Sequence, residues 1–181
     1  MNPRRPPNPY RLRRTAHPAT DAAPTPTDAA MMRAALDLAR SAADAGEVPV
    51  GAIVYETSTG KVLAQAANTR ANAREPHGHA EFLAIRDACN AIGDWRLNHC
   101  TLIVTLEPCI MCAGLIINAR VGRLVYSADD PKAGAVRSLY RLLEDPRLNH
   151  RITPIRGVLA HESSELLREF FRARRRTPQR G

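Results

Sequence analysis

The chain has 181 residues, of which 44% are hydrophobic and only 4% aromatic, so it suits one domain with a largely aliphatic core. No apolar run approaches the roughly 20 residues of a membrane-spanning helix, and four cysteines without a paired secretory pattern favour a reducing compartment such as the cytoplasm. The formal net charge of +8 favours an anionic partner, most simply nucleic acid.

Residues 1–27 form a proline-rich and arginine-rich extension. They have no hydrophobic period, so we expect them to be disordered, and they lack the apolar stretch of a secretory signal. An organellar transit peptide is an alternative, but five prolines among the first eighteen residues oppose the amphipathic helix that such a peptide forms. At the other end, residues 177–181 are a short basic tail.

The surplus positive charge lies at these two ends. Five arginines precede Asp21, the first acidic residue, and five follow Glu169, the last one. The remaining 16 of the 26 basic residues stand against 18 acidic ones, so the body is nearly neutral. Basic ends on such a body indicate an anionic polymer, and a solubilising tail without a partner is the alternative.

Residues 28–176 carry the patterns of one folded domain. The expected elements are a helix from Asp28, as N-cap, to Gly46, strands at 48–55 and 61–66, an irregular loop at 68–78, a helix at 79–92, a strand at 101–107, a helix at 109–119, strands at 121–127 and 152–159, and a helix at 162–175. The last helix is amphipathic, with Leu166, Leu167, Phe170 and Phe171 expected to face inward. Strands that alternate with helices around one sheet predict an α/β fold.

Four residues in the middle of the chain form a candidate metal site. Cys109 and Cys112 are three positions apart, so both sulfurs of one helix can reach the same ion. His79 supplies a third ligand, and three N/S ligands leave the open fourth position of a catalytic zinc site. Glu81, two residues after His79, converges with it only at a helix end, and it is the nearest group to move protons.

A closed structural zinc site is the alternative, with Cys100, Cys89 or His77 as the fourth ligand. Cys100 opens an apolar strand and Cys89 lies among apolar helix residues, so both are typical of small core residues. A structural site also leaves Glu81 without a role.

The pattern His79-x-Glu81 followed by Pro108-Cys109-x-x-Cys112 resembles the zinc-dependent nucleoside and nucleobase deaminases. Further blocks are similar to the bacterial tRNA-specific adenosine deaminases of the TadA type, and the resemblance covers about residues 29 to 176. These blocks are Glu47 to Ala52, Thr101 to Ala113, Ala133-Gly134-Ala135, Leu148 to Arg151 and Phe170-Phe171-Arg172.

The resemblance implies a three-layer α/β/α sandwich around a mixed sheet of about five strands. It implies one Zn²⁺ per subunit and hydrolysis of adenosine to inosine at wobble position 34 of tRNA. A zinc-activated hydroxide attacks C6 of adenine, and Glu81 shuttles the protons. It also implies a cytoplasmic homodimer that binds the anticodon loop. The residues it assigns to substrate binding are Asn68, Asp130, Lys132, Asn149, Phe171 and Arg174.

Two other functions remain open at this point. A small-molecule deaminase for cytidine, cytosine or guanine uses the same metal chemistry, but the basic last helix and the long match to the tRNA type disfavour it. A non-catalytic, zinc-stabilised tRNA-binding subunit is the second alternative. The presence of Glu81 opposes it, because such a subunit needs no proton shuttle.

Overall fold

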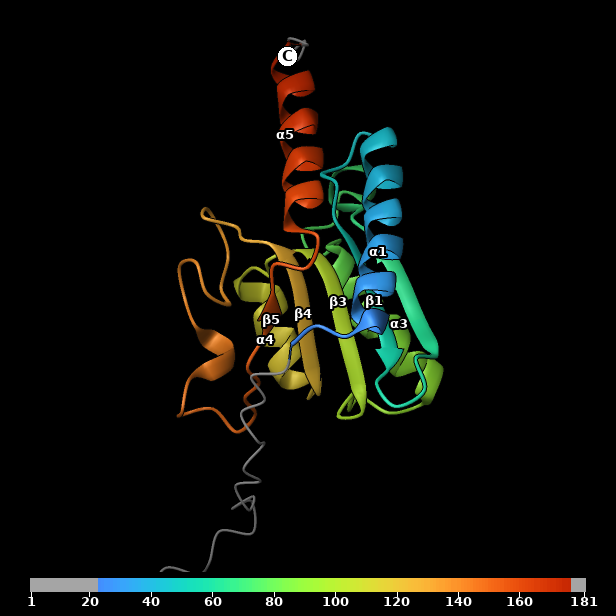
Figure 1. The fold of residues 1–181 in the computed structure, drawn as a ribbon, viewed down its shortest axis with the longest axis vertical. Helices are drawn as coiled ribbons and strands as arrows, with labels where there is room; N and C mark the ends of the chain where they lie inside the picture. Colours follow the sequence, from blue (N-terminus) through green and yellow to red (C-terminus); the bar gives the residue numbers. More distant parts are fainter. Residues whose placement is uncertain (1–22, 177–181) are drawn as a thin grey trace, which may run out of the picture.

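The computed structural model describes residues 23–176, so most of the extension at 1–27, which we expect to be disordered, and the tail at 177–181 lie outside the described part. Five strands form one mixed sheet in the order β2-β1-β3-β4-β5 (Figure 1). They are β1 (Gly51–Glu56), β2 (Val62–Ala67), β3 (Cys100–Leu106), β4 (Arg123–Ala128) and β5 (Ile155–Arg156). β1 pairs antiparallel with β2 and β3, whereas β3, β4 and β5 run parallel. The predicted α/β class is confirmed.

Helices cover both faces of this sheet. They are α1 (Pro26–Asp44), α2 (Arg70–Ala73), α3 (Ala80–Ile92), α4 (Ile110–Asn118) and α5 (Ala160–Arg176), with a 3₁₀ turn η1 (Leu142–Glu144). Ile53 and Ile103 pack with α1, whereas their neighbours Val54 and Leu102 pack with α3 and α4. Successive strand residues thus point to opposite helix layers, which explains why the central strands are apolar throughout. Within residues 23–176, no helix is long and apolar enough to cross a membrane.

The first helix begins earlier than the sequence predicts. Its N-cap is Thr25, and Asp28 is the N3 residue of a capping box. The Asp28 carboxylate is buried. It also accepts hydrogen bonds from Tyr55, at 2.6 Å, and from both terminal nitrogens of Arg123, at 2.6 Å. Although burial opposes ionisation, these bonds hold the pKa of Asp28 well below its ordinary value. Asp28 therefore joins α1 to the sheet.

Three further expectations differ from the structure. The loop at 68–78 contains the helical turn α2, and the strand predicted at 152–159 is reduced to Ile155–Arg156. Of the predicted inward face of the last helix, Leu166, Leu167 and Phe170 are half-buried, whereas the prediction is wrong for Phe171, which is 44% exposed. Figure 1 shows why, because the second half of α5 extends past the sheet and has little to pack against.

Candidate metal centre

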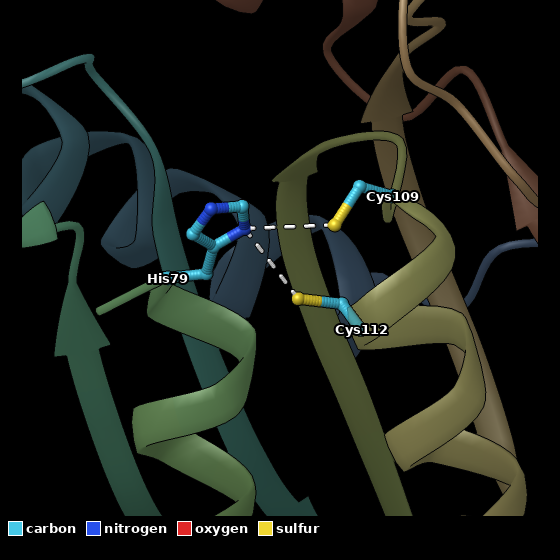
Figure 2. Close-up of side chains that lie close together, drawn as sticks. All are labelled: His79, Cys109 and Cys112. Atoms are coloured by element: carbon cyan, nitrogen blue, oxygen red, sulfur yellow. Dashed lines mark hydrogen bonds between the residues drawn. The ribbon is translucent and has the colours of Figure 1, made fainter. Parts of the chain in front are cut away.

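The N-termini of α3 and α4 meet at the ends of β2 and β3 (Figures 1 and 2). His79 is the N-cap of α3, and Cys109 is the N-cap of α4, both with extended backbone. Cys112 follows in the first turn of α4. Pro108 therefore precedes the cap rather than opening the helix. This arrangement lets side chains 30 positions apart point into one space between two helix ends.

The three donor atoms have the spacing of a tetrahedral metal site. Nδ1 of His79 lies 3.6 Å from the sulfur of Cys109 and 3.6 Å from that of Cys112, as Figure 2 shows. Bond lengths of about 2.0 Å for Zn–N and about 2.3 Å for Zn–S give a tetrahedral N···S edge of roughly 3.6 Å. All three ligand atoms lie within 4.8 Å of one another. The donor set therefore fits a zinc-sized ion without rearrangement.

The two thiols have opposite pKa shifts because they share a hydrogen bond. The hydrogen bond from Cys112 and the contact with His79 outweigh the effect of burial and lower the pKa of Cys109 to about 3. The same sulfur–sulfur contact, together with burial, raises the pKa of Cys112. The hydrogen bond to Cys109 raises the pKa of His79. A metal ion that binds here displaces the shared protons, so its affinity increases with pH.

Glu81 lies beside this group in the first turn of α3. Its side chain is buried, with 5% exposure, and burial raises the pKa of its carboxyl group. The Cys112 thiol is its hydrogen-bond partner and the charge of His79 favours its ionised form. A carboxylate whose pKa is raised toward neutrality can both accept and return a proton, which is the property of a general acid–base group.

The other ligand candidates from the sequence do not join the metal group. Cys100 is buried at the start of β3, and the Cys89 thiol donates to the carbonyl of Trp95 at 3.5 Å. His77 pairs with Glu75 at 3.5 Å. Within residues 23–176, the cluster that could hold a metal ion has three members, which leaves a fourth coordination position open.

Asn68, one of the expected substrate contacts, follows β2 at the start of the segment that leads to His79. It is buried, and its backbone N–H donates to Val50. The next residue, Thr69, donates to the carbonyl of Gly78 at 2.9 Å, directly before His79. A Cβ at Gly78 would lie 3.0 Å from the Arg70 backbone, so any larger residue would push the two segments apart by a few tenths of an ångström.

Asp130 and Lys132 lie on the loop after β4, which adjoins the second metal helix. Ala135 donates to the carbonyl of Pro108 at 2.8 Å, and Gly134 forms a β-bridge with Cys109. Lys132 is exposed and its backbone N–H is held by Asp130. The loop therefore extends from the metal ligands toward solvent.

The remaining expected contacts are not brought to the metal group. Asn149 is exposed beside the buried His150, whose Nε2 lies 2.8 Å from the Val121 carbonyl. Phe171 and Arg174 are on the exposed part of α5, and Arg174 donates to the carbonyl of Gly46 at 3.3 Å. Asn149, Phe171 and Arg174 are therefore surface residues outside the metal group.

Two buried carboxylates near the site escaped the sequence reasoning. Glu107 follows β3 and accepts hydrogen bonds from a whole loop, namely from the backbone of Asp130, Val136, Arg137 and Ser138 and from the Ser138 hydroxyl. Glu47 precedes β1 and accepts from Asn68 and Asn72. The available signal was their position, because each acidic residue adjoins a proline-containing apolar segment where a solvated side chain is unusual.

Comparison with known proteins identifies the family. The sheet order and the His/Cys/Cys group are those of a deaminase, and the model of the MafB19-like deaminases matches residues 27–175. The tRNA-specific adenosine deaminase of Bacillus subtilis (strain 168) is 42% identical over 149 residues, which cover 82% of this chain and 91% of the relative. That of Agrobacterium fabrum (strain C58 / ATCC 33970) is 44% identical over 144 residues, covering 80% and 93%.

Solved structures agree with this result. One, from a study of A-to-I editing by tRNA:A34 deaminases at the wobble position, has a TM-score of 0.71 and 43% identity, covering 75% of this chain and 97% of its own. A guanine deaminase from Nitrosomonas europaea has a TM-score of 0.70 but 26% identity, covering 88% and 95%. The chain belongs to the deaminase family, in the group of tRNA-specific adenosine deaminases.

Proposed function

We propose that the protein hydrolyses adenosine to inosine at wobble position 34 of tRNA and releases ammonia. The observation that carries this proposal is the buried Glu81 beside an open three-donor group. Relatives at 42% and 44% identity are named tRNA-specific adenosine deaminases, which supports the choice of substrate.

The metal in this proposal is zinc, held by His79, Cys109 and Cys112. Two thiolates and a neutral imidazole are soft ligands that suit Zn²⁺ in tetrahedral geometry and balance its charge. Zinc, when bound, acts as a Lewis acid that lowers the pKa of a water molecule to about 7. Thiolate ligands survive best in a reducing compartment, which favours the cytoplasm, where tRNA is also found.

Glu81 moves the protons of the reaction. Its carboxylate accepts a proton from the attacking water, delivers it to N1 of adenine and then assists the departure of ammonia from C6. Burial excludes bulk water from this carboxylate, so each transfer is directed to the bound base. One water is consumed for each ammonia released.

The proposed substrate contacts rest on the resemblance to the tRNA-specific adenosine deaminases. Asn68 meets the target base, which leaves the anticodon stack to reach the buried metal group. Asp130, Lys132 and Asn149 border the groove for the neighbouring nucleotides, and Phe171 and Arg174 on α5 contact the loop farther out. Anticodon loops are single-stranded, so their bases unstack at little cost.

We also propose that the protein acts as a homodimer. Large apolar side chains are exposed on the segments that adjoin the metal group, with Ile110 54%, Leu139 52% and Tyr140 49% exposed. Such side chains beside a site favour burial against a second chain.

The test is conversion of an anticodon stem-loop with adenosine at its wobble position, read by sequencing because inosine pairs as guanosine. We expect Glu81→Ala to lower kcat by about 10²- to 10⁴-fold while zinc stays near one per chain. His79→Ala, as the matched ligand control, should lose both zinc and activity. Zinc loss in Glu81→Ala, or activity near that of the parent, contradicts the assignment.

The same experiment separates the small-molecule alternative. Ammonia release from guanine, cytosine and cytidine is measured beside the stem-loop. Turnover of a free base or nucleoside at a higher kcat/KM than the stem-loop would overturn the tRNA proposal and place the chain with enzymes such as guanine deaminase.

A further inference from the structure

Glu47 is a buried carboxylate whose partners are neutral. It is 2% exposed and lies between α1 and β1. Its Oε2 accepts a hydrogen bond from Nδ2 of Asn68 at 3.1 Å, and its Oε1 accepts from the backbone N–H of Asn72 at 2.5 Å. Both partners belong to the segment that leads into the metal helix. The buried Glu47 carboxylate therefore holds two residues of that segment, Asn68 and Asn72, by hydrogen bonds.

The chemistry of a carboxylate determines which way the Asn68 amide faces. An ionised carboxylate only accepts hydrogen bonds, whereas an asparagine amide has one accepting end and one donating end. The donating Nδ2 must therefore face Glu47, because the opposite orientation brings two acceptors together in a buried place. Asn68 is itself only 7% exposed, so water cannot compensate for that orientation. Its Oδ1 and one remaining N–H are left for a ligand, in a fixed order.

A second bond prevents Glu47 from turning away. The bond to the Asn72 backbone holds the other carboxylate oxygen, and the Asn72 side chain donates to the Ala45 carbonyl at 3.0 Å. The segment also folds back on Gly78, the residue before His79, through the Thr69 backbone. Glu47, Asn68 and the metal helix are thus parts of one short network.

We propose that Glu47 is a positioning residue, which fixes the amide orientation of Asn68 and thereby the hydrogen-bonding pattern that the target nucleotide meets. The effect on turnover rests on the proposed role of Asn68 in binding the base. The geometric part, the orientation of the amide, does not depend on the substrate. The two parts are therefore tested separately.

The amide orientation is measured by NMR on the zinc-loaded, ¹⁵N-labelled protein. The side-chain NH₂ pair of Asn68 is identified by its absence in Asn68→Ala. In the parent, we expect one of the two protons to resonate downfield, because it is bonded to the carboxylate. In Glu47→Gln this shift should be lost and the proton should exchange with water about tenfold faster, because the carboxylate acceptor is gone. An unchanged NH₂ pair in Glu47→Gln overturns the inference, whatever the enzyme acts on.

The effect on turnover is measured on the adenosine stem-loop as a double-mutant cycle. Asn68→Ala and Glu47→Gln should each lower kcat/KM by about 10- to 100-fold with zinc retained, and their combination should be no more than about threefold worse than Asn68→Ala alone. Multiplying effects would show that Glu47 acts independently of Asn68 and overturn the proposal. A parent enzyme that leaves the stem-loop unchanged instead rejects the proposed function, and the NMR result still decides the orientation.

Asn72→Ala is the control for loop anchoring, because it removes the bond to Ala45 and keeps the backbone donor to Glu47. We expect kcat/KM within about twofold of the parent. If Asn72→Ala reproduces the loss seen in Glu47→Gln, Glu47 merely anchors the loop and the proposal is wrong.

Exchanging the carboxylate at position 47 and the amide at position 68 tests the proposal even if one single variant loses activity through misfolding. Asn68→Asp alone places two carboxylates in contact, so we expect a larger loss of kcat/KM than for Asn68→Ala. Adding Glu47→Gln places an NH₂ donor at position 47 against the new carboxylate at position 68. The second oxygen of that carboxylate still faces the ligand as an acceptor. The exchanged pair should recover at least about tenfold over Asn68→Asp alone, and no recovery would count against the orienting role.

Discussion

Replacing Glu107 by glutamine tests how the loop beside the metal group is held. The carboxylate accepts three backbone bonds at Oε1, from Val136 at 3.1 Å, Arg137 at 2.7 Å and Ser138 at 2.8 Å. Oε2 accepts the Asp130 N–H at 2.9 Å and the Ser138 hydroxyl. A Cβ at Gly134 would lie 2.3 Å from the carboxyl carbon, so the loop packs directly on this group.

The expected loss in the free energy of unfolding follows from the hydrogen bonds that glutamine cannot accept at this position. A glutamine side chain can keep its oxygen at the three-donor side, but its NH₂ then faces the Asp130 N–H. A hydrogen bond to a charged group contributes about 1.5–3 kcal/mol, and a buried unsatisfied donor costs about 1–3 kcal/mol. We expect Glu107→Gln to lower the free energy of unfolding by about 3 kcal/mol. For a chain of this size, that corresponds to a fall in Tm of roughly 6–12 °C.

The assay is urea unfolding at one protein concentration, with the exposed Glu169→Gln as control, which should stay within about 0.5 kcal/mol of the parent. Burial raises the pKa of Glu107, but the bonds from Ser138, Asp130 and Arg137 outweigh it, so the net pKa lies below the ordinary 4.5. Its contribution is therefore complete above pH 4.5 and is lost as pH falls through the lowered pKa. A Glu107→Gln effect below about 0.5 kcal/mol, or a difference from the parent that grows toward acid, refutes the reasoning.

Two further predictions concern the metal and the basic ends. Cys100→Ser and Cys89→Ser should cost only packing stability and keep zinc near one per chain, and metal analysis showing zinc loss in either variant would revive a closed four-ligand site. Truncation after Phe171 should weaken tRNA binding and flatten the log–log salt dependence of binding by about 0.7–0.9 for each phosphate that is no longer neutralised. Deletion of residues 2–22, which spares the Thr25 cap, should change this slope less. If the N-terminal deletion has the larger effect, the roles of the two ends are exchanged.

Local spacing explains why much of the site could be predicted. Cys109 and Cys112 share one helix turn, and that relation holds wherever the helix is placed. His79 and Glu81, two apart, had to stand at a helix end to converge, and His79 is indeed an N-cap. The alternating order of strands and helices likewise limits the fold to an α/β layer arrangement.

The remaining features depend on contacts between distant residues. Asp28 has the sequence context of a cap, but its main partner Arg123 is 95 positions away. The face of α5 follows an amphipathic pattern, yet Phe171 stays exposed because the helix runs past the sheet. A periodic pattern indicates which side chains share a face, and it does not reveal how far the neighbouring layer extends.

The sequence by itself determined the α/β class and the set of N/S donors with a carboxylate beside them, because these depend on short-range periodicity and on the ligand chemistry of the residue types. Only the tertiary structure decided that Glu47 and Glu107 are buried carboxylates that shape the surroundings of those donors. Their partners lie 21 to 31 positions along the chain, in segments that meet only when the sheet forms. The neighbouring apolar, proline-containing residues are the local sign of burial, but the donors that stabilise each carboxylate come from residues that the fold brings to it.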